Sequence, residues 1–278
     1  MAVVGYLGPK GSFTYVALKD FLNKHHDDWD MQDFLTIPSV IEALKKKEID
    51  YGFVPFENSI EGVVTQTVDQ LICHDGVVIQ AEWVMPICLA LMGTHDATLH
   101  TLKQVVSHPQ PLAQCAQYLA QTLPHAQTSY RGSTSQAVQE VTHSGIAVVG
   151  HPILAQLFGL TILADHIEDH ASNCTRFFKL GSDICAPGSR DRTSFVLWIP
   201  DRAGALEEVL RVFAMQGINL TSISSRPTKT QLGRYVFWLE CEGHISDASL
   251  RCVLSVLSEK QCHYRCLGSY PRFEECSC

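Results

Sequence analysis

The sequence predicts an α/β protein with a second, smaller domain of the ferredoxin-like βαββαβ type. The chain has 278 residues and 46% hydrophobic content, which is enough for about two domains. The region before about residue 165 alternates short apolar runs with longer amphipathic stretches, as strands and helices around a mainly parallel sheet do. Gly, Ser, Pro and charged residues then cluster at 181–191, which is typical of a connection between domains.

In the first domain, strands are predicted where short runs rich in Val and Ile are bounded by Gly, Pro or charged residues. These strands cover residues 2–6, 50–54, 104–107 and 145–149. A further strand is predicted at 177–180, after the polar run at 168–172. Helices are predicted where apolar residues recur at helical spacing. They cover residues 39–47, 111–122, 136–141 and 152–158, and Ser39 is a suitable N-cap for the first of them.

The second domain is predicted to begin near residue 192. Strands are expected at 193–199, 218–225, 234–241 and 263–267, with helices at 204–215 and 246–258. That order is βαββαβ. Because an exposed face or edge of such a sheet often pairs with a second copy, we expect a homodimer, or a tetramer, assembled through this region.

The composition excludes several kinds of partner. The chain has 29 acidic and 21 basic side chains and a formal charge of −8, which repels nucleic-acid backbones. No stretch approaches the roughly 18 apolar residues that a membrane-spanning helix requires, and the N-terminus lacks the pattern of a secretory signal. We therefore expect a soluble, cytoplasmic protein that binds neither nucleic acid nor membranes.

The eleven cysteines are mostly scattered singly through apolar contexts, so we expect reduced thiols. Near the C-terminus, Cys262, Cys266, Cys276 and Cys278 lie close to His263. Their spacing matches no zinc-finger pattern, so no metal site is predicted there.

Four segments of the first domain gather polar residues at strand ends, where open α/β sheets place their ligand crevice. The first is GPKGSF at residues 8–13, a turn into a helix whose amides could hold an anion, although glycine also suits such a turn for backbone reasons. The second is PFENSIEG at residues 55–62, which offers more donors and acceptors than a capping loop needs. The third is SHPQ at residues 107–110, in which His108 has either a catalytic or a structural role.

The fourth segment is Asn173-Cys174-Thr175-Arg176-Phe177, which follows Ile167-Glu168-Asp169. It resembles the signature of prephenate dehydratases, and the other three segments resemble that family's remaining motifs in the same order. The second domain resembles the ACT domain of regulated members. The resemblance implies a two-lobed, periplasmic-binding-protein-like catalytic domain at 1–183, an ACT domain at 192–270 and a cysteine-containing tail at 271–278.

The family's reaction is the decarboxylating dehydration of prephenate to phenylpyruvate in phenylalanine biosynthesis, and it calls for no redox cofactor or metal. The resemblance implies that Thr175 donates a hydrogen bond or proton to the departing hydroxyl. Arg176 suits a substrate carboxylate, or alternatively forms a structural ion pair. The other candidate substrate-binding residues are Glu57, Asn58, Ser59, Gln110, Thr134 and Phe177. For Thr134 the alternative is helix capping, and for Phe177 it is the core.

In ACT domains, two places hold a bound amino acid, and the resemblance extends to both. The corresponding residues are Gly204, Ala205, Leu206, Asn219, Leu220, Ser225 and Arg226. We expect feedback inhibition by L-phenylalanine. One departure matters here, because Ser224 stands where the family's Glu-Ser-Arg-Pro element has its glutamate, so binding or inhibition could be weakened.

Three alternatives stay open at this point. The same fold could act on arogenate, or bind an amino acid without catalysis. Hydrolase chemistry is disfavoured because no Gly-x-Ser-x-Gly elbow and no visible arrangement of Ser, His and acid are present.

Overall fold

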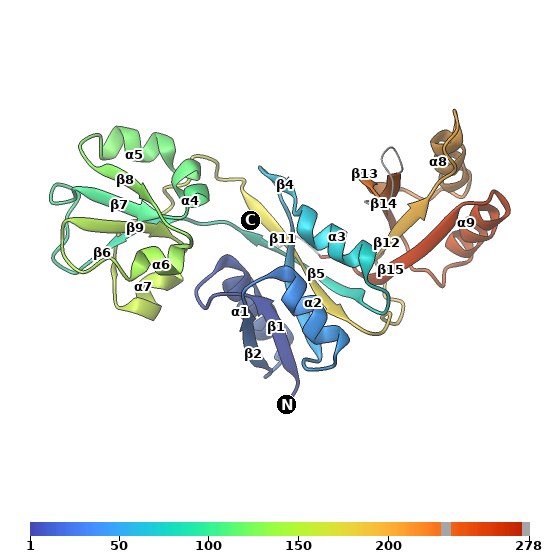
Figure 1. Cartoon of the computed structure of the whole chain (residues 1–278), viewed down its shortest axis with the longest axis horizontal. Coiled ribbons are helices and arrows are strands. Elements are labelled where there is room, and N and C mark those ends of the chain that lie inside the picture. The colour runs from blue at the N-terminus through green and yellow to red at the C-terminus, as the bar shows by residue number, and fades with distance from the viewer. Residues whose placement is uncertain (229–234, 274–278) are drawn as a thin grey trace. The chain divides into compact units, whose positions relative to one another are not determined.

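The structure is a computed structural model that describes residues 1–228 and 235–273 (Figure 1). Its strands form three sheets. The first sheet has the order β2-β1-β3-β11-β5, and β4 pairs with β3. Its strands are β1 (Val3–Leu7), β2 (Asp30–Phe34), β3 (Tyr51–Asn58), β4 (Gly62–Val63), β5 (Val78–Pro86) and β11 (Cys174–Gly181).

The second sheet has the order β10-β6-β9-β7-β8. Its strands are β6 (Ala90–Gly93), β7 (Gln104–Ser107), β8 (Gln127–Tyr130), β9 (Ile146–Gly150) and β10 (Thr161–Ala164). Strands β7, β8 and β9 pair in parallel, whereas β6 pairs antiparallel with both β9 and β10. The expectation of a mainly parallel sheet was therefore wrong in part, because β6, through which the chain enters this lobe, runs against the other four strands.

The chain passes between these two sheets twice, after β5 and before β11, so the catalytic region has the expected two lobes. Its helices are α1 (Phe13–His25), α2 (Ile37–Lys45), α3 (Thr65–Cys73), α4 (Pro109–Gln114), α5 (Ala116–Thr122), α6 (Thr134–Val138) and α7 (Ile153–Phe158). Helices α6 and α7 pack on the second sheet through one apolar cluster that includes Val106, Val138, Val148 and Leu154.

The single helix expected at 111–122 is two helices, and the break is a tertiary effect. Cys115, between α4 and α5, is fully buried and has a non-helical φ of −121°. The backbone N–H of Asp169 donates to the Gln114 carbonyl at 2.7 Å. The Asp169 carboxylate accepts from the backbone N–H groups of Gln117 at 3.0 Å and Tyr118 at 3.3 Å. A distant carboxylate thus caps α5, which local periodicity cannot reveal.

The third sheet belongs to the C-terminal region and has the order β13-β14-β12-β15. In chain order its elements are β12 (Asp191–Trp198), α8 (Ala205–Met215), β13 (Leu220–Pro227), β14 (Tyr235–Glu242), α9 (Ala248–Glu259) and β15 (His263–Pro271). This is the predicted βαββαβ order. Apolar side chains of α8 and α9 meet those of β12 and β14 in one core, which includes Phe195, Val209, Leu239 and Leu254.

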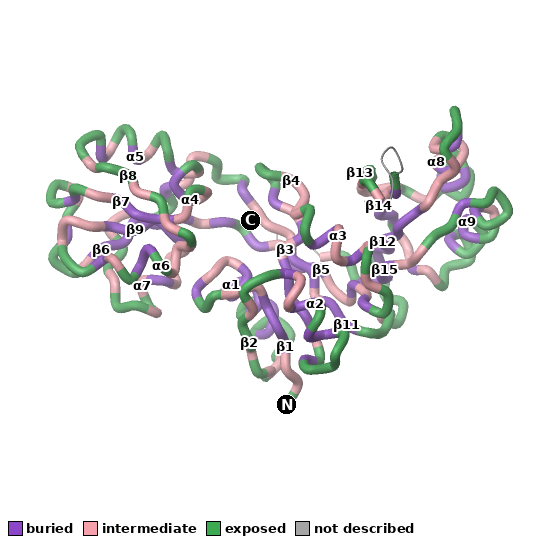
Figure 2. Tube along the Cα trace, viewed as in Figure 1, coloured by how far each residue is buried: buried purple, intermediate pink, exposed green. Residues whose placement is uncertain are grey.

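The chain divides into two compact units. One comprises Met1–Val40, Phe53–Val64 and Val84–Phe177, and the other comprises Ile41–Gly52, Thr65–Trp83 and Phe178–Cys278. Strands β9 and β12 are almost wholly buried (Figure 2). Within the second unit, Gly268 on β15 has a φ of 145°, and a Cβ there would lie 2.2 Å from the Ile79 carbonyl oxygen. Only glycine permits this approach of β15 to β5.

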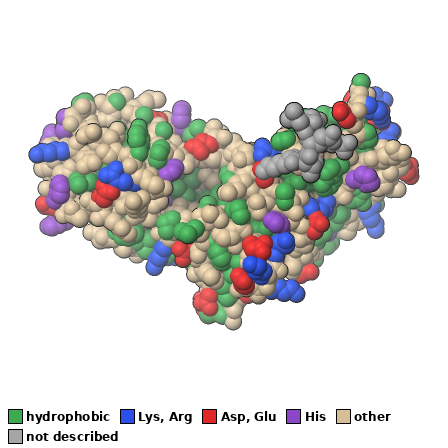
Figure 3. Space-filling view, in the orientation of Figure 1, with side chains coloured by type: hydrophobic (Ala, Val, Ile, Leu, Met, Phe, Trp, Pro, Cys, Tyr) green, Lys and Arg blue, Asp and Glu red, His purple; other side chains and the backbone are tan. Residues whose placement is uncertain are grey.

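None of the helices in the described residues combines the length and apolar character needed to cross a membrane. The cysteines in this part of the chain are free thiols. They include Cys262 and Cys266, whereas Cys276 and Cys278 lie outside the described residues. On the face drawn in Figure 3, Lys and Arg side chains form small separate groups with Asp and Glu nearby.

Candidate active site

The second and fourth polar segments lie side by side, because β3 and β11 are neighbours in the first sheet. The backbone N–H of Ser59 donates to the Cys174 carbonyl at 2.9 Å. In return, the Cys174 N–H donates to the Ser59 hydroxyl oxygen at 3.0 Å. The residues 57–59 and 173–176 therefore form one continuous polar group at the end of β3 and the start of β11.

The amide of Asn58 organises this group. Its side-chain oxygen accepts from the backbone N–H groups of Ile60 and Glu61, each at 3.0 Å. These two bonds fix which way the amide points, so its Nδ2 faces β11. There the Nδ2 donates to the hydroxyl oxygen of Thr175 at 3.0 Å and to the side-chain oxygen of Asn173 at 2.8 Å.

Thr175 therefore receives a hydrogen bond on its oxygen while its own O–H remains available to another acceptor. A hydroxyl has one donor and two acceptor sites, and occupying an acceptor site from the amide polarises the O–H bond. Asn58 is buried at 7% exposure, whereas Thr175 is half-buried. The pair can thus present an oriented donor to a ligand.

Arg176 forms an ion pair, which was the structural alternative for this residue. Its Nη2 lies 2.9 Å from the Glu57 Oε2, and its guanidinium lies 4.5 Å from the centre of the Phe56 ring. The Arg176 side chain is 12% exposed and that of Glu57 is 42% exposed. The partner carboxylate therefore lies on the solvent side of the pair, where a ligand carboxylate could replace it.

Phe177 lies in the core, the second of the two roles considered for it. It is 1% exposed, and its ring stacks on Phe53 with centroids 5.6 Å apart. It supports the strand that carries Thr175.

Asn173 belongs to the matched motif, but sequence reasoning assigned it no role. It is 2% exposed, and its Nδ2 has no hydrogen-bond partner in the described residues. A buried amide group without a partner costs roughly 1–3 kcal/mol, so it is a ready donor for a ligand. No pattern in the sequence distinguishes this asparagine from a turn residue.

A second polar group lies in the other lobe, at the end of β7. The Ser107 hydroxyl donates to the Val149 carbonyl at 2.6 Å and lies 3.4 Å from the Thr134 hydroxyl. Ser133, not Thr134, caps α6, because its oxygen accepts from the Gln136 N–H. The capping alternative for Thr134 is thus filled by its neighbour, which leaves the Thr134 hydroxyl for other partners.

The SHPQ segment has a clear local role. His108 caps α4, since its Nδ1 accepts from the backbone N–H of Gln110 at 3.3 Å. This is the structural alternative for His108. Gln110 is half-buried at the start of the same helix, so its side chain remains a candidate for binding.

The GPKGSF turn leads into α1 as predicted. The Ser12 oxygen accepts from the Tyr15 N–H at 3.2 Å and caps the helix. The carbonyl of Lys10 accepts from the Ser135 hydroxyl at 3.2 Å, which ties the turn to α6. At the start of α1, the Phe13 ring packs edge-on against the His151 ring, with ring centroids 5.9 Å apart.

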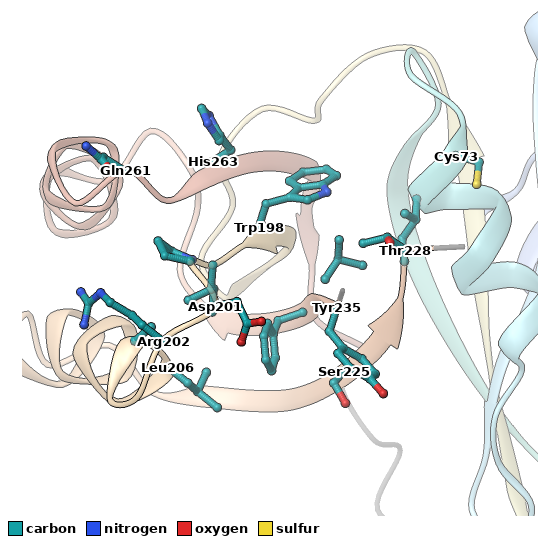
Figure 4. A pocket seen from close by; sticks show the side chains of 16 residues that line it. Cys73, Trp198, Asp201, Arg202, Leu206, Ser225, Thr228, Tyr235, Gln261 and His263 are labelled. Carbon is teal, nitrogen blue, oxygen red and sulfur yellow. The ribbon is translucent and has the colours of Figure 1, made fainter. Parts of the chain in front are cut away.

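A pocket of about 910 Å³ lies within the second compact unit (Figure 4). Its walls come from the C-terminal sheet, the start of α8 and the end of α3. Of the predicted effector residues, Ala205, Leu206 and Ser225 line it. Gly204 directly precedes α8 with a φ of 82°. Trp198, Phe237 and Tyr235 supply aromatic surface.

The remaining effector candidates have other surroundings. Arg226 lies 2.9 Å from Asp69 on α3, and Leu220 packs against the apolar core. Asn219 is exposed, and its carbonyl accepts from the Glu242 N–H at 3.0 Å. None of these three is among the residues that line the described pocket.

A sequence model of the prephenate dehydratase family matches residues 4–184. The chain belongs to this family. An ACT-domain model matches residues 193–251. The resemblance to prephenate dehydratases with an ACT domain is therefore confirmed, and so is the fold class of two α/β lobes followed by a ferredoxin-like domain.

Other prephenate dehydratases match over nearly the whole chain. The bifunctional chorismate mutase/prephenate dehydratase of Aquifex aeolicus (strain VF5) is 38% identical over 97% of this chain and 73% of that protein. The prephenate dehydratase of Lactococcus lactis subsp. cremoris (strain MG1363) is 33% identical over 96% of both. A crystal structure of prephenate dehydratase from Arthrobacter aurescens in complex with L-Phe has a TM-score of 0.88 and 30% identity. That match covers 97% of this chain and 90% of the other.

Proposed function

We propose that this prephenate dehydratase family member converts prephenate to phenylpyruvate, with Thr175 as the donor to the departing hydroxyl. One observation carries the assignment of roles. The Asn58 amide donates to the Thr175 oxygen at 3.0 Å, so the threonine proton is free for a ligand. The bond joins the two polar segments that the family resemblance singled out.

The chemistry balances without an oxidant or reductant. The bond from the ring to its carboxylate breaks, carbon dioxide leaves, and the electron pair moves into the ring. The bond from the ring to the hydroxyl oxygen then breaks, and that oxygen leaves as water after gaining one proton. A donor that strengthens as negative charge builds on the leaving oxygen stabilises the transition state more than the ground state.

The two carboxylates of prephenate require cationic and hydrogen-bonding partners. Arg176 would bind one of them by exchanging Glu57 for the substrate carboxylate. Ser59 and Asn173 in one lobe, with Gln110 and Thr134 in the other, would orient the ring and the pyruvyl side chain. Asn58, whose amide is fully occupied, would act through its bonds to Thr175 and Asn173. Phe177 would act only through packing behind β11.

The test is to incubate the purified full chain with prephenate and follow phenylpyruvate formation. The T175A variant is expected to lower kcat by roughly a hundredfold, because a positioned donor is worth ~3 kcal/mol. The T175S variant keeps the hydroxyl and is expected to retain most of the activity. A folded T175A protein with the parent's kcat would contradict the assignment.

Parallel assays separate the alternatives that the sequence left open. Faster turnover of arogenate than of prephenate would change the substrate and keep the chemistry. Turnover of neither would favour an amino-acid sensor. Release of an acid from ester or amide substrates would favour a hydrolase.

We also propose that L-phenylalanine binds where α8 begins, on the pocket wall formed by Ala205, Leu206 and Ser225, and inhibits the enzyme. The aromatic surface of Trp198 and Phe237 in the same pocket suits an apolar ring. The relative from Arthrobacter aurescens was crystallised with L-Phe, which supports this choice of effector.

Titration calorimetry with phenylalanine, alongside activity assays, tests this regulation. Because Ser224 replaces the family's glutamate, the S224E variant is expected to bind phenylalanine more tightly than the parent. L206A is expected to weaken binding, since it removes apolar surface from the pocket wall. If the parent neither binds phenylalanine nor is inhibited by it, the proposal is wrong.

The domain boundaries, the cellular location and the oligomeric state of the protein are also proposals. The catalytic domain would comprise residues 1–183, the ACT domain 192–270 and the tail 271–278. The protein would be cytoplasmic and would form homodimers, or tetramers built from them. Sedimentation of the purified chain measures the assembly state. A monomer at all concentrations would exclude the homodimer and the tetramer.

A further inference from the structure

Three potential metal ligands come together where the chain passes between the two lobes. They are the thiol of Cys88, the imidazole of His166 and the carboxylate of Glu168. One ligand atom from each lies within 4.8 Å of the others. Cys88 follows β5 and the other two precede β11, so the group joins the segment that leaves the first lobe to the segment that returns.

The carboxylate is already oriented. The Glu168 side chain is 7% exposed, and its Oε2 accepts from the backbone N–H of Leu89 at 2.8 Å. Its Oε1 is thereby turned toward the His166 Nδ1, 3.4 Å away. Two ligands at ~2.0–2.1 Å from a tetrahedral zinc ion are themselves ~3.3–3.4 Å apart, so this pair is at ligand spacing.

The histidine is open to solvent and held in an uncommon backbone conformation. Its φ is 51°, in the left-handed region, and its side chain is 68% exposed. The Asp165 carboxylate accepts from the His166 backbone N–H at 2.9 Å and helps to hold this turn. A cation can therefore reach the ring from solvent, and the exposed ring can adjust to it.

The types of ligand define the cation. A thiolate, an imidazole nitrogen and a carboxylate oxygen suit zinc-like ions, whereas magnesium and calcium prefer sites made wholly of oxygen. The Cys88 thiol would release its proton to solvent as the metal–sulfur bond forms.

We propose that Cys88, His166 and Glu168 bind one thiophilic divalent cation such as Zn²⁺, with a fourth position open to water. None of the three ligands is among the residues assigned to dehydration.

The bound cation braces the two connecting segments. These segments already pair, since Ile87 N–H donates to the Asn173 carbonyl at 2.8 Å and Ile167 N–H donates to the Leu89 carbonyl at 2.9 Å. Asn173 is also bonded to Asn58 in the candidate active site. A cation held by both segments would therefore restrain the base of the candidate active site.

Cobalt titration of the full chain tests the site, because Co²⁺ bound to a thiolate absorbs in the near ultraviolet. The background carries C276S and C278S, so that thiols of the tail cannot contribute. One equivalent of Co²⁺ is expected to produce the band, and Zn²⁺ but not Mg²⁺ is expected to abolish it. C88S should lose the band, and H166A should weaken binding at least tenfold.

The matched control is C252S, which removes an exposed thiol on α9 and should leave the titration unchanged. An unchanged band in C88S, or an H166A affinity within twofold of the parent, would overturn the site. H166A alters an exposed side chain, so it remains informative if C88S fails to fold.

Hydrogen exchange tests the bracing of the two connecting segments. Exchange at the Leu89 and Ile167 amides should slow when Zn²⁺ is added to the parent, but not when it is added to C88S or H166A. Unchanged exchange rates in the parent would overturn the bracing.

Discussion

Both ends of the Asn58 side-chain amide are occupied, and this determines the direction of its bond to Thr175. Two backbone N–H groups hold the oxygen, so the nitrogen must face β11. An asparagine here therefore does more than stabilise a turn, because it keeps the threonine hydroxyl in the donor role. Under the proposed assignment, Asn58 is a positioning residue that acts through Thr175.

The N58D variant tests this role. Aspartate can still accept from Ile60 and Glu61, but its second oxygen would accept the Thr175 proton instead of donating to the oxygen. We expect kcat to fall roughly a hundredfold, as for T175A. In the N58D/T175A double variant the losses should not multiply, because both changes remove one donor. Multiplied losses would show that the two residues act independently.

His151 makes the stability of the fold depend on pH. Burial lowers its pKa from 6.5 to about 4, against a smaller opposite effect of Asp165. The neutral ring accepts the Ile153 N–H on Nδ1 at 3.1 Å, and a proton there would remove this bond. Between these two pKa values the unfolded chain binds more protons, so stability is full above pH 6.5 and falls as the pH drops toward 4.

We expect the parent to lose up to ~3 kcal/mol of unfolding free energy through this group between pH 6.5 and 4. Urea denaturation of parent and H151Q across this range measures it. H151Q should lack this part of the slope, while H125Q, at an exposed site, should keep it. Equal slopes in parent and H151Q would contradict the burial argument.

At the scale of elements, α3 is held at both its middle and its end by arginines from the C-terminal sheet. Arg226 on β13 pairs with Asp69 in the helix. Arg265 on β15 donates to the carbonyls of Leu71 and Ile72, the latter at 2.8 Å, and pairs with Asp75. These carbonyls are the unpaired groups of a helix end, so a guanidinium there both caps the helix and complements its dipole.

The R265Q variant should therefore destabilise the protein by ~1–2 kcal/mol, because it removes the charge and most of the donors at the end of α3. Chemical denaturation measures this difference. R251Q is the matched control, since Arg251 is exposed on α9. A loss in R265Q no larger than in R251Q would mean that the cap contributes little.

At the scale of the molecule, one compact unit combines part of the prephenate dehydratase match with the whole ACT match. Strand β5 supplies Glu82, which lies 2.6 Å from Arg192 on β12. Glu240 on β14 lies 3.6 Å from the same guanidinium and also accepts from the Trp238 indole N–H at 3.2 Å. All three ionic side chains are at most 10% exposed. The regulatory domain is thus joined to the catalytic sheet by buried charges.

Replacing Arg192 with methionine would remove the guanidinium that lies beside the buried carboxylates of Glu82 and Glu240. We expect R192M to lower the unfolding free energy by ~3–5 kcal/mol. R272M breaks the pair with Glu242, whose side chains are 48% and 45% exposed, and should cost under ~1 kcal/mol. Thermal and urea unfolding compare the two variants, and similar losses would show that the buried network adds no stability.

Local patterns determined most of the ACT region. Its six elements occur in the predicted order because alternating and helical periodicities are properties of neighbouring residues. In the catalytic region the same signals located β1, β3, β7 and β9. They did not reveal β2, which is short and mostly exposed, or β5, which carries Glu82 in a buried position. A charged residue indicates an exposed segment unless the buried partner that neutralises it is known, and that partner lies far away in the sequence.

The sequence alone determined the fold class, the family and the segments that carry the candidate chemistry, since these depend on local order and on motifs. Only the tertiary structure decided how those residues act. Asn58 and Thr175 are 117 positions apart, and their bond depends on β3 lying beside β11. The break at Cys115 and the grouping of Cys88 with His166 and Glu168 have the same origin. Contacts between distant segments follow from strand order and packing, which no local pattern encodes.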